Sequence, residues 1–157
     1  MTLLRQADGK FLRQGVESAA SLEKGFPVGK AELFRYKALI LGSVEASFFT
    51  FDQLRMMADF VSHRGGGLLM LGGKNSFGQG GYAHTPLEYV LPLQLGPISG
   101  GAGEFQDVEY KAGLTRYGVQ HPVTRLALSE EQNLRRWAAA PPLVGWNPTA
   151  GPKPGAT

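Results

Sequence analysis

The feature that most constrains this chain is an apolar run, residues 68–71, placed between the glycines 65–67 and a glycine-rich polar loop, residues 72–82. A short apolar run bounded by turn signals is typical of a strand that is buried on both faces. Ligands of open α/β sheets bind beyond the carboxyl ends of such strands. The sequence therefore predicts a buried strand and places the first candidate site in the loop after it.

A strand–helix–strand unit leads into this loop. Residues 36–41 are expected to form its first strand. Thr50 and Gln53 have the spacing of a capping box, apolar residues then recur at helical spacing, and Gly65 is a helix stop signal. Because the helix joins two strands across a crossover, we expect the strands to be parallel and the connection right-handed.

Weaker signals flank this unit. Thr85 and Glu88 have capping-box spacing, so a second helix is expected to begin there and to end before Pro92. Residues 105–110 alternate in polarity, which indicates a half-exposed strand, and Ser129 has the capping-box form of a third helix start. These elements extend the predicted fold on both sides of the central loop.

The length of 157 residues suits a single domain, and 43% hydrophobic with 18% charged residues is a globular composition. We expect one domain over residues 1–157 that is a fragment of a longer chain. Residues 1–35 give no strand of ordinary length, and residues 145–157 form a proline- and glycine-rich approach with no strand after it.

Composition limits the chemistry. The absence of cysteine excludes thiolate catalysis, thiolate metal sites and disulfides. The 16 Lys and Arg are scattered among 13 Asp and Glu, which does not favour nucleic-acid binding. No run of about 18 apolar residues is present, so we expect no direct membrane insertion by this stretch. No ligand spacing for a metal and no cofactor motif is found, and we expect neither.

The loop partly matches two phosphate-binding motifs but meets the full requirements of neither. Gly73 and Lys74 resemble the end of a P-loop, but Leu68 stands where the first glycine should be and Asn75 where a hydroxyl residue should be. A dinucleotide fingerprint also requires a long helix directly after the glycines, and none is predicted there. Lys74 remains a candidate to neutralise an anionic ligand.

Catalysis has weak candidates. Ser76 would need a base, and His84 and His121 are the histidines that could approach it, but no nucleophile-elbow motif surrounds the serine. The alternative is a structural loop in which Asn75 and Ser76 satisfy local backbone groups. Glycines would also let backbone amides face an anionic or carbonyl group. The candidate ligand-binding residues are Gly72, Gly73, Lys74, Asn75, Ser76 and Tyr82.

The strand 36–42 and the block 65–92, with His121-Pro122-Val123 and the segment 142–147, resemble the glutamine-amidotransferase-like domain of bacterial proteins. The resemblance implies an α/β fold of the flavodoxin-like class, with a doubly wound, mainly parallel sheet and helices on both faces. With residues 11–13 and 25–27, this version is similar to domains of large membrane-anchored proteins that carry a von Willebrand factor A-type domain. That similarity implies an extracytoplasmic location, with the cytoplasm as the alternative.

The departures from this family bear on function. A working class I glutamine amidotransferase places a cysteine on the turn after the strand equivalent to residues 68–71, with a His/Glu pair to activate it. This chain has Gly72-Gly73 at that turn, and Val123 stands where the acid would follow His121-Pro122. The resemblance then implies a non-catalytic module that binds another domain of the same polypeptide, a partner protein or a small ligand. A hydrolase that uses Ser76 and a purely structural scaffold stay open, and the oligomeric state is undetermined.

Overall fold

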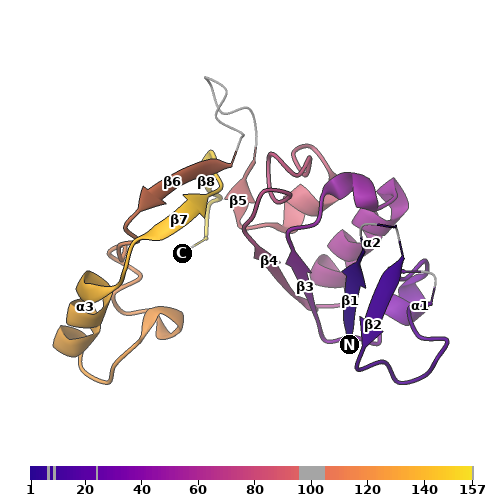
Figure 1. The fold of residues 1–157 in the computed structure, drawn as a ribbon, viewed down its shortest axis with the longest axis horizontal. Helices are drawn as coiled ribbons and strands as arrows, with labels where there is room; N and C mark the ends of the chain where they lie inside the picture. Colours follow the sequence, from indigo (N-terminus) through magenta and orange to yellow (C-terminus); the bar gives the residue numbers. More distant parts are fainter. Residues whose placement is uncertain (7, 9, 24, 96–104, 157) are drawn as a thin grey trace.

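The computed structural model describes residues 1–6, 8, 10–23, 25–95 and 105–156. Figure 1 shows a larger lobe that contains β1 to β4 and a smaller lobe that contains β6, β7 and α3. The strands are β1 Thr2–Arg5, β2 Phe11–Gln14, β3 Ala38–Gly42, β4 Gly67–Leu71, β5 Leu93–Gln94, β6 Gln106–Tyr110, β7 Leu143–Trp146 and β8 Gly151–Pro152. The α-helices are α1 Lys30–Leu33, α2 Phe51–Ser62 and α3 Glu130–Ala139, and the 3₁₀ helices are η1 Ala46–Phe48, η2 Pro86–Val90 and η3 Pro122–Thr124.

The predicted strand–helix–strand unit is confirmed. β3 and β4 are parallel, in register from Ala38 opposite Gly67 to Gly42 opposite Leu71. The crossover helix α2 begins after a complete capping box, in which the Gln53 N–H donates to Thr50 Oγ1 at 3.2 Å and the Thr50 N–H donates to Gln53 Oε1 at 3.0 Å. Local sequence therefore determined where this helix starts.

The core lies between α2 and one face of the β3–β4 pair. Met57 and Phe60 of α2 are fully buried there, with Leu41 of β3 beside them. The opposite face of the pair is open: Ile40 and Leu69, which face each other in the ladder, are 67% and 51% exposed. The prediction that residues 68–71 are buried on both faces is therefore wrong, because the described helices cover one side of this sheet.

The prediction of a flavodoxin-like, doubly wound parallel sheet is also wrong. β3–β4 is the one parallel pair among the described strands, whereas β1–β2, β5–β8 and β6–β7 are antiparallel two-stranded sheets. A doubly wound sheet needs repeated crossover helices. After β4 the chain instead forms the short 3₁₀ helix η2 and the two-residue strand β5, which pairs with β8 near the end of the chain. The residue pattern predicted the local unit correctly, whereas the sheet that the resemblance implies is not present among the described strands.

The helix expected at Thr85 is the 3₁₀ helix η2, which has no side-chain cap. Instead of reaching back to the cap backbone, the Glu88 carboxylate accepts from the N–H of His84 at 2.6 Å and from the N–H of Leu95 at 2.8 Å. Burial raises the pKa of Glu88, but these two backbone bonds, together with the charges of His84 and Lys153, lower it by more, so the pKa lies below the ordinary value. Glu88 therefore joins both ends of η2, and Pro92 prevents a longer helix.

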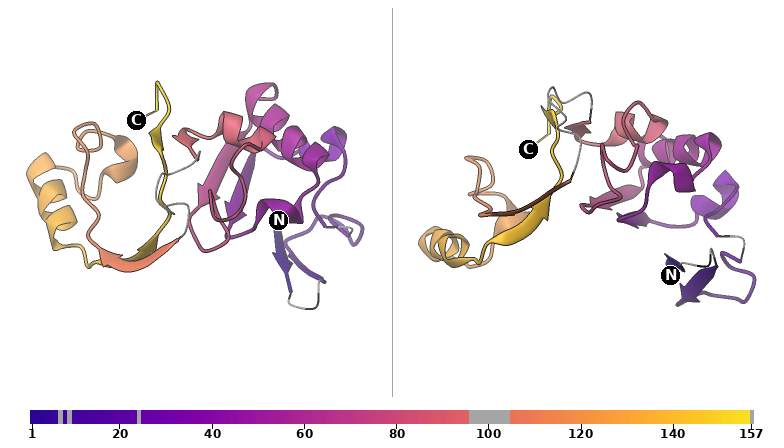
Figure 2. Two further views of the ribbon diagram at one scale, coloured as in Figure 1. Left: turned by 90° about the horizontal axis from the view of Figure 1, so that it is seen from above. Right: turned by 45° about the horizontal axis from the view of Figure 1, so that its top comes forward.

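The smaller lobe is formed by residues 106–146, which we call the arm. Figure 2 shows the β6–β7 ribbon and α3 extending away from the β3–β4 pair. The predicted strand near 105–110 is confirmed as β6, and the predicted helix start at Ser129 is confirmed, because the Gln132 N–H donates to Ser129 Oγ at 3.3 Å. Gln106 pairs with Trp146, so the first and last residues of the arm lie side by side.

The amino-terminal hairpin was not predicted from the sequence. β1 and β2 are antiparallel, with Leu4 opposite Leu12. Each strand has four residues, which is too short for the alternation of polarity to be distinctive.

Candidate ligand groove at the end of β4

The loop of residues 72–82 folds back on itself. Its backbone is held by bonds from the Ser76 N–H to the Gly73 oxygen, from the Gly80 N–H to the Ser76 oxygen and from the Tyr82 N–H to the Phe77 oxygen, at 3.1, 3.0 and 3.1 Å. A Cβ at Gly80 would lie 2.3 Å from the Asn75 oxygen, so this crossing of the loop requires glycine. These N–H groups serve the loop itself rather than a ligand.

Ser76, the candidate nucleophile, is 1% exposed. Its hydroxyl donates to the backbone oxygen of Leu71 at 2.8 Å, so the proton that a base would have to remove is committed to a carbonyl. The exposed His84 and His121 have no described bond to Ser76. The N–H of His84 donates to Glu88, and Nδ1 of His121, on the arm, accepts from the Val123 N–H at 3.2 Å. Ser76 therefore satisfies a local backbone group, which is the structural alternative to catalysis that the sequence left open.

Asn147 is a site residue that the sequence analysis missed. Its Oδ1 accepts from the Gly73 N–H at 2.8 Å, and its Nδ2 donates to the Gly73 oxygen at 2.9 Å. A Cβ at Gly72 would lie 2.9 Å from Asn147 Oδ1, and a Cβ at Gly73 would lie 2.7 Å from Ser43 Oγ. The absence of a Cβ at these two glycines therefore leaves the space that the side chains of Asn147 and Ser43 occupy. No local pattern could reveal this contact, because its partners are 74 residues apart.

The remaining candidates of the loop have partners or are buried. Lys74 Nζ lies 3.3 Å from Asp107 Oδ2 on β6 and 5.9 Å from the centroid of the Phe105 ring. Tyr82 is fully buried, and its hydroxyl donates to the Val44 oxygen at 2.7 Å. Burial, followed by the nearby charge of Glu45, raises the pKa of the Tyr82 phenol. Tyr82 thus belongs to the core, and Lys74 lies toward the arm.

A groove of about 460 Å³ lies between the loop and the arm. Four aromatic side chains line it, together with the backbone of Gly72 and Gly73, and we call it the aromatic groove. Gly145 on β7, with φ of +86°, permits its shape, since a Cβ there would lie 2.2 Å from the Phe105 ring. The four rings are those of Phe77, Phe105, Tyr110 and Trp146.

Two of the six predicted ligand-binding residues line the aromatic groove. Gly72 and Gly73 border the aromatic groove, whereas Lys74, Asn75, Ser76 and Tyr82 are not among its lining residues. The amide of Asn75 makes instead a long contact, 3.5 Å, to the Ser43 oxygen. The rings at 110 and 146 lie in β6 and β7, and Phe105 directly precedes β6, so all three come from segments far along the sequence from the loop.

Within the ranges that the structure describes, no group of three or more His, Asp or Glu side chains is placed to hold a metal ion. The helices of those ranges include none with the length and apolar character needed to cross a membrane. Comparison with protein-family models, with curated protein sequences and with solved structures gives no match.

Proposed function

We propose that this chain is a non-catalytic binding module and that its ligand site is the aromatic groove. The observation that carries the proposal is the convergence of four rings on one cavity: one from the loop after β4, two from the arm, and that of Phe105, which directly precedes the arm. Aromatic walls with few polar groups bind flat apolar groups through burial and stacking. The ligand is a flat apolar side chain that a partner protein, or another domain of the same polypeptide, inserts between the rings.

The side-chain amide of Asn147, which also lines the groove, supports a positioning role over a chemical one. Both ends of the Asn147 amide are bonded to Gly73, so this amide holds the floor of the groove in place. The buried Ser76 hydroxyl donates to the Leu71 oxygen, and the chain has no cysteine. We include in the proposal a relationship to glutamine-amidotransferase-like domains that have lost their nucleophile.

The direct test is binding of aromatic side-chain analogues. Indole and p-cresol, titrated into the protein and followed by ligand-observed NMR, are expected to bind saturably. Trp146→Ala removes a ring that is 42% exposed at the groove and should weaken binding about fivefold, which corresponds to about 1 kcal/mol of stacking and burial. Val123→Ala, which removes an 83% exposed side chain elsewhere on the arm, is the matched control.

Two results would refute the proposal. If the Trp146→Ala and Val123→Ala proteins bind indole equally, the aromatic groove is not the ligand site. If the purified protein releases ammonia from glutamine, and Ser76→Ala abolishes that release, the module is catalytic.

A further inference from the structure

A second groove runs along the side of β3 that faces away from β4. Its cavity, about 470 Å³, is lined by all five residues of β3 and by none of β4. Leu3 and Leu4 of β1 line the other side, and Figure 1 shows β1 on the side of β3 opposite β4. Among the described strands β3 pairs with β4 alone, so the backbone edge of β3 borders this groove without a neighbouring strand. We call it the β3 edge groove.

The β3 edge groove is apolar in its middle. Leu39, Leu41 and Phe49 line it from the core side, and Leu4, 48% exposed, lines it from β1. Side chains of both faces of β3 border it, including the 67% exposed Ile40. A cavity that contacts successive residues of one strand follows the strand edge rather than one face, because successive side chains point to opposite faces.

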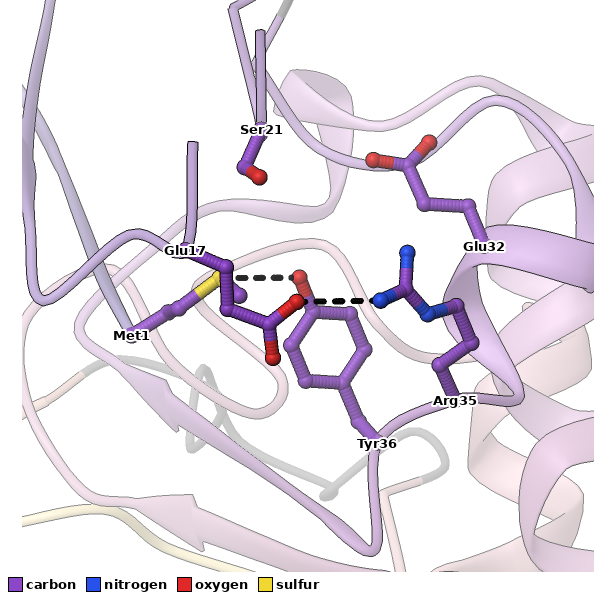
Figure 3. Close-up of a pocket in the computed structure, with 6 residues that line it drawn as sticks. All are labelled: Met1, Glu17, Ser21, Glu32, Arg35 and Tyr36. Carbon is purple, nitrogen blue, oxygen red and sulfur yellow. Dashed lines mark hydrogen bonds and ion pairs between the residues drawn. The ribbon is translucent and has the colours of Figure 1, made fainter. Parts of the chain in front are cut away.

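The two ends of the groove differ in charge. At the Gly42 end a neighbouring cavity contains Arg5 and Glu45, which pair at 2.7 Å and leave no net charge. At the Tyr36 end a smaller pocket of about 160 Å³, drawn in Figure 3, shares Met1 and Tyr36 with the edge groove.

Figure 3 shows two carboxylates and one guanidinium around the Tyr36 ring. Arg35 Nη2 pairs with Glu17 Oε2 at 2.9 Å, and the Tyr36 hydroxyl donates to Met1 Sδ at 3.2 Å. The Glu32 carboxylate points toward the same pocket and has no ion pair within the described ranges. Burial, with the negative charges of Glu32 and Glu17, raises the pKa of Tyr36. Because Arg35 is paired with Glu17, the carboxylate of Glu32 is the charge without an ion pair among the described residues of this pocket, and it would attract a cation.

We propose that the β3 edge groove binds an extended peptide segment of a partner protein as an added strand beside β3, with apolar residues along β3 and a basic residue at the Glu32 end. Main-chain groups at a free strand edge pair readily with an incoming strand, and side-chain pockets then select its sequence. Five residues of β3 span about 16 Å, so a segment of five or six residues covers the edge. The complementary charges of Glu32 and the basic residue fix the direction in which the segment lies.

The probes are two capped hexapeptides of alternating valine and threonine with one lysine, placed first in one peptide and last in the other. Isothermal calorimetry is expected to show saturable binding, with one lysine position preferred over the other. The preferred peptide, N-methylated at alternate residues, should bind at least about tenfold more weakly, because two or three main-chain hydrogen bonds are lost. Since this comparison uses the unmodified protein, it does not depend on any variant folding.

Matched variants locate the site. Leu4→Asp puts a charge into the groove and should weaken binding about tenfold, whereas Leu12→Asp, at the paired and 44% exposed position outside the lining, should not. Glu32→Gln should weaken binding of the lysine peptide about threefold and leave a peptide with glutamine in place of lysine unaffected. Glu109→Gln on β6 is the control for the loss of one carboxylate.

Four outcomes would overturn the proposal. The first is failure of both peptides to bind at millimolar concentration. The second is equal binding of the N-methylated peptide, which would exclude pairing with the edge of β3. The third is an equal effect of Leu4→Asp and Leu12→Asp. A concentration-dependent dimer that occupies the groove and blocks the peptide would also overturn it, because the occupant would then be a second copy.

Discussion

Asn147 pairs with Gly73 through both ends of its side-chain amide, as a neighbouring strand would pair with it. The Gly73 N–H donates to Oδ1 at 2.8 Å and Nδ2 donates to the Gly73 oxygen at 2.9 Å. One side chain thereby supplies a short piece of sheet that joins the segment after β7 to the turn after β4. The position of the loop depends on a residue near the other end of the chain.

Replacing Asn147 by alanine should destabilise the protein by about 1–3 kcal/mol, because both polar groups of Gly73 lose their partner in a part-buried site. Asn147→Asp keeps the acceptor and loses the donor, so a large part of the effect should remain. Urea unfolding followed by circular dichroism measures the free energy. Asn75→Ala, which removes a single long contact, is the control and should change stability much less.

Gly80→Ala should destabilise the protein by about 1–3 kcal/mol, since the added Cβ would lie 2.3 Å from a backbone oxygen that cannot rotate away. Gly113→Ala is the control, because its Cβ would meet nothing within 4 Å. The shift in thermal midpoint distinguishes them. Equal midpoints for the two variants would show that the loop does not cross at Gly80 as described.

Ser76→Ala should cost about 1–2 kcal/mol of stability, because the Leu71 oxygen loses its donor in a buried position. Hydrolysis of p-nitrophenyl acetate should be at background for both proteins. A background rate in the variant combined with a higher, saturable rate in the unmodified protein would restore Ser76 as a nucleophile.

Acid should weaken the two hydrogen bonds by which the Glu88 carboxylate joins the ends of η2. The pKa of Glu88 is lowered in the folded state, so its contribution to stability is complete above the ordinary value of 4.5 and is lost as the pH falls through the lowered folded value. Glu88→Gln should destabilise the protein by about 1.5 kcal/mol at pH 7 and flatten the decline in stability below pH 4.5. Chemical unfolding at a series of pH values measures both effects, and Glu109→Gln should retain the decline of the unmodified protein.

The sequence predicted what local chemistry determines. The Thr50 capping box, the parallel β3–β4 pair and the start of α3 at Ser129 are all where the pattern placed them. The capping box predicted at Thr85 does not form, because the Glu88 carboxylate accepts from the N–H groups of His84 and Leu95 instead. A spacing pattern contains no information about these competing donors. Local signals were reliable wherever no other backbone group competed for the same side-chain atoms.

The global sheet and most of the groove could not be predicted. The exposure of Ile40 and Leu69 depends on which elements cover the sheet. An apolar run in the sequence is the same whether one face of the strand or both faces are covered, so the pattern could not predict this exposure. The rings of Phe105 and Trp146 reach the candidate loop through antiparallel pairing of distant segments. A resemblance centred on the glycine loop carried no information about that pairing.

The pairing of Gln106 with Trp146 means that the arm leaves and rejoins the rest of the protein at one point. A segment with adjoining ends can be cut out and replaced by a tight turn without breaking the covalent path of the remainder. The arm can therefore be deleted as a unit. A shortened chain that joins residue 105 to residue 147 through two glycines would retain β3, α2 and β4 and would lose Tyr110 and Trp146, two of the four rings of the aromatic groove.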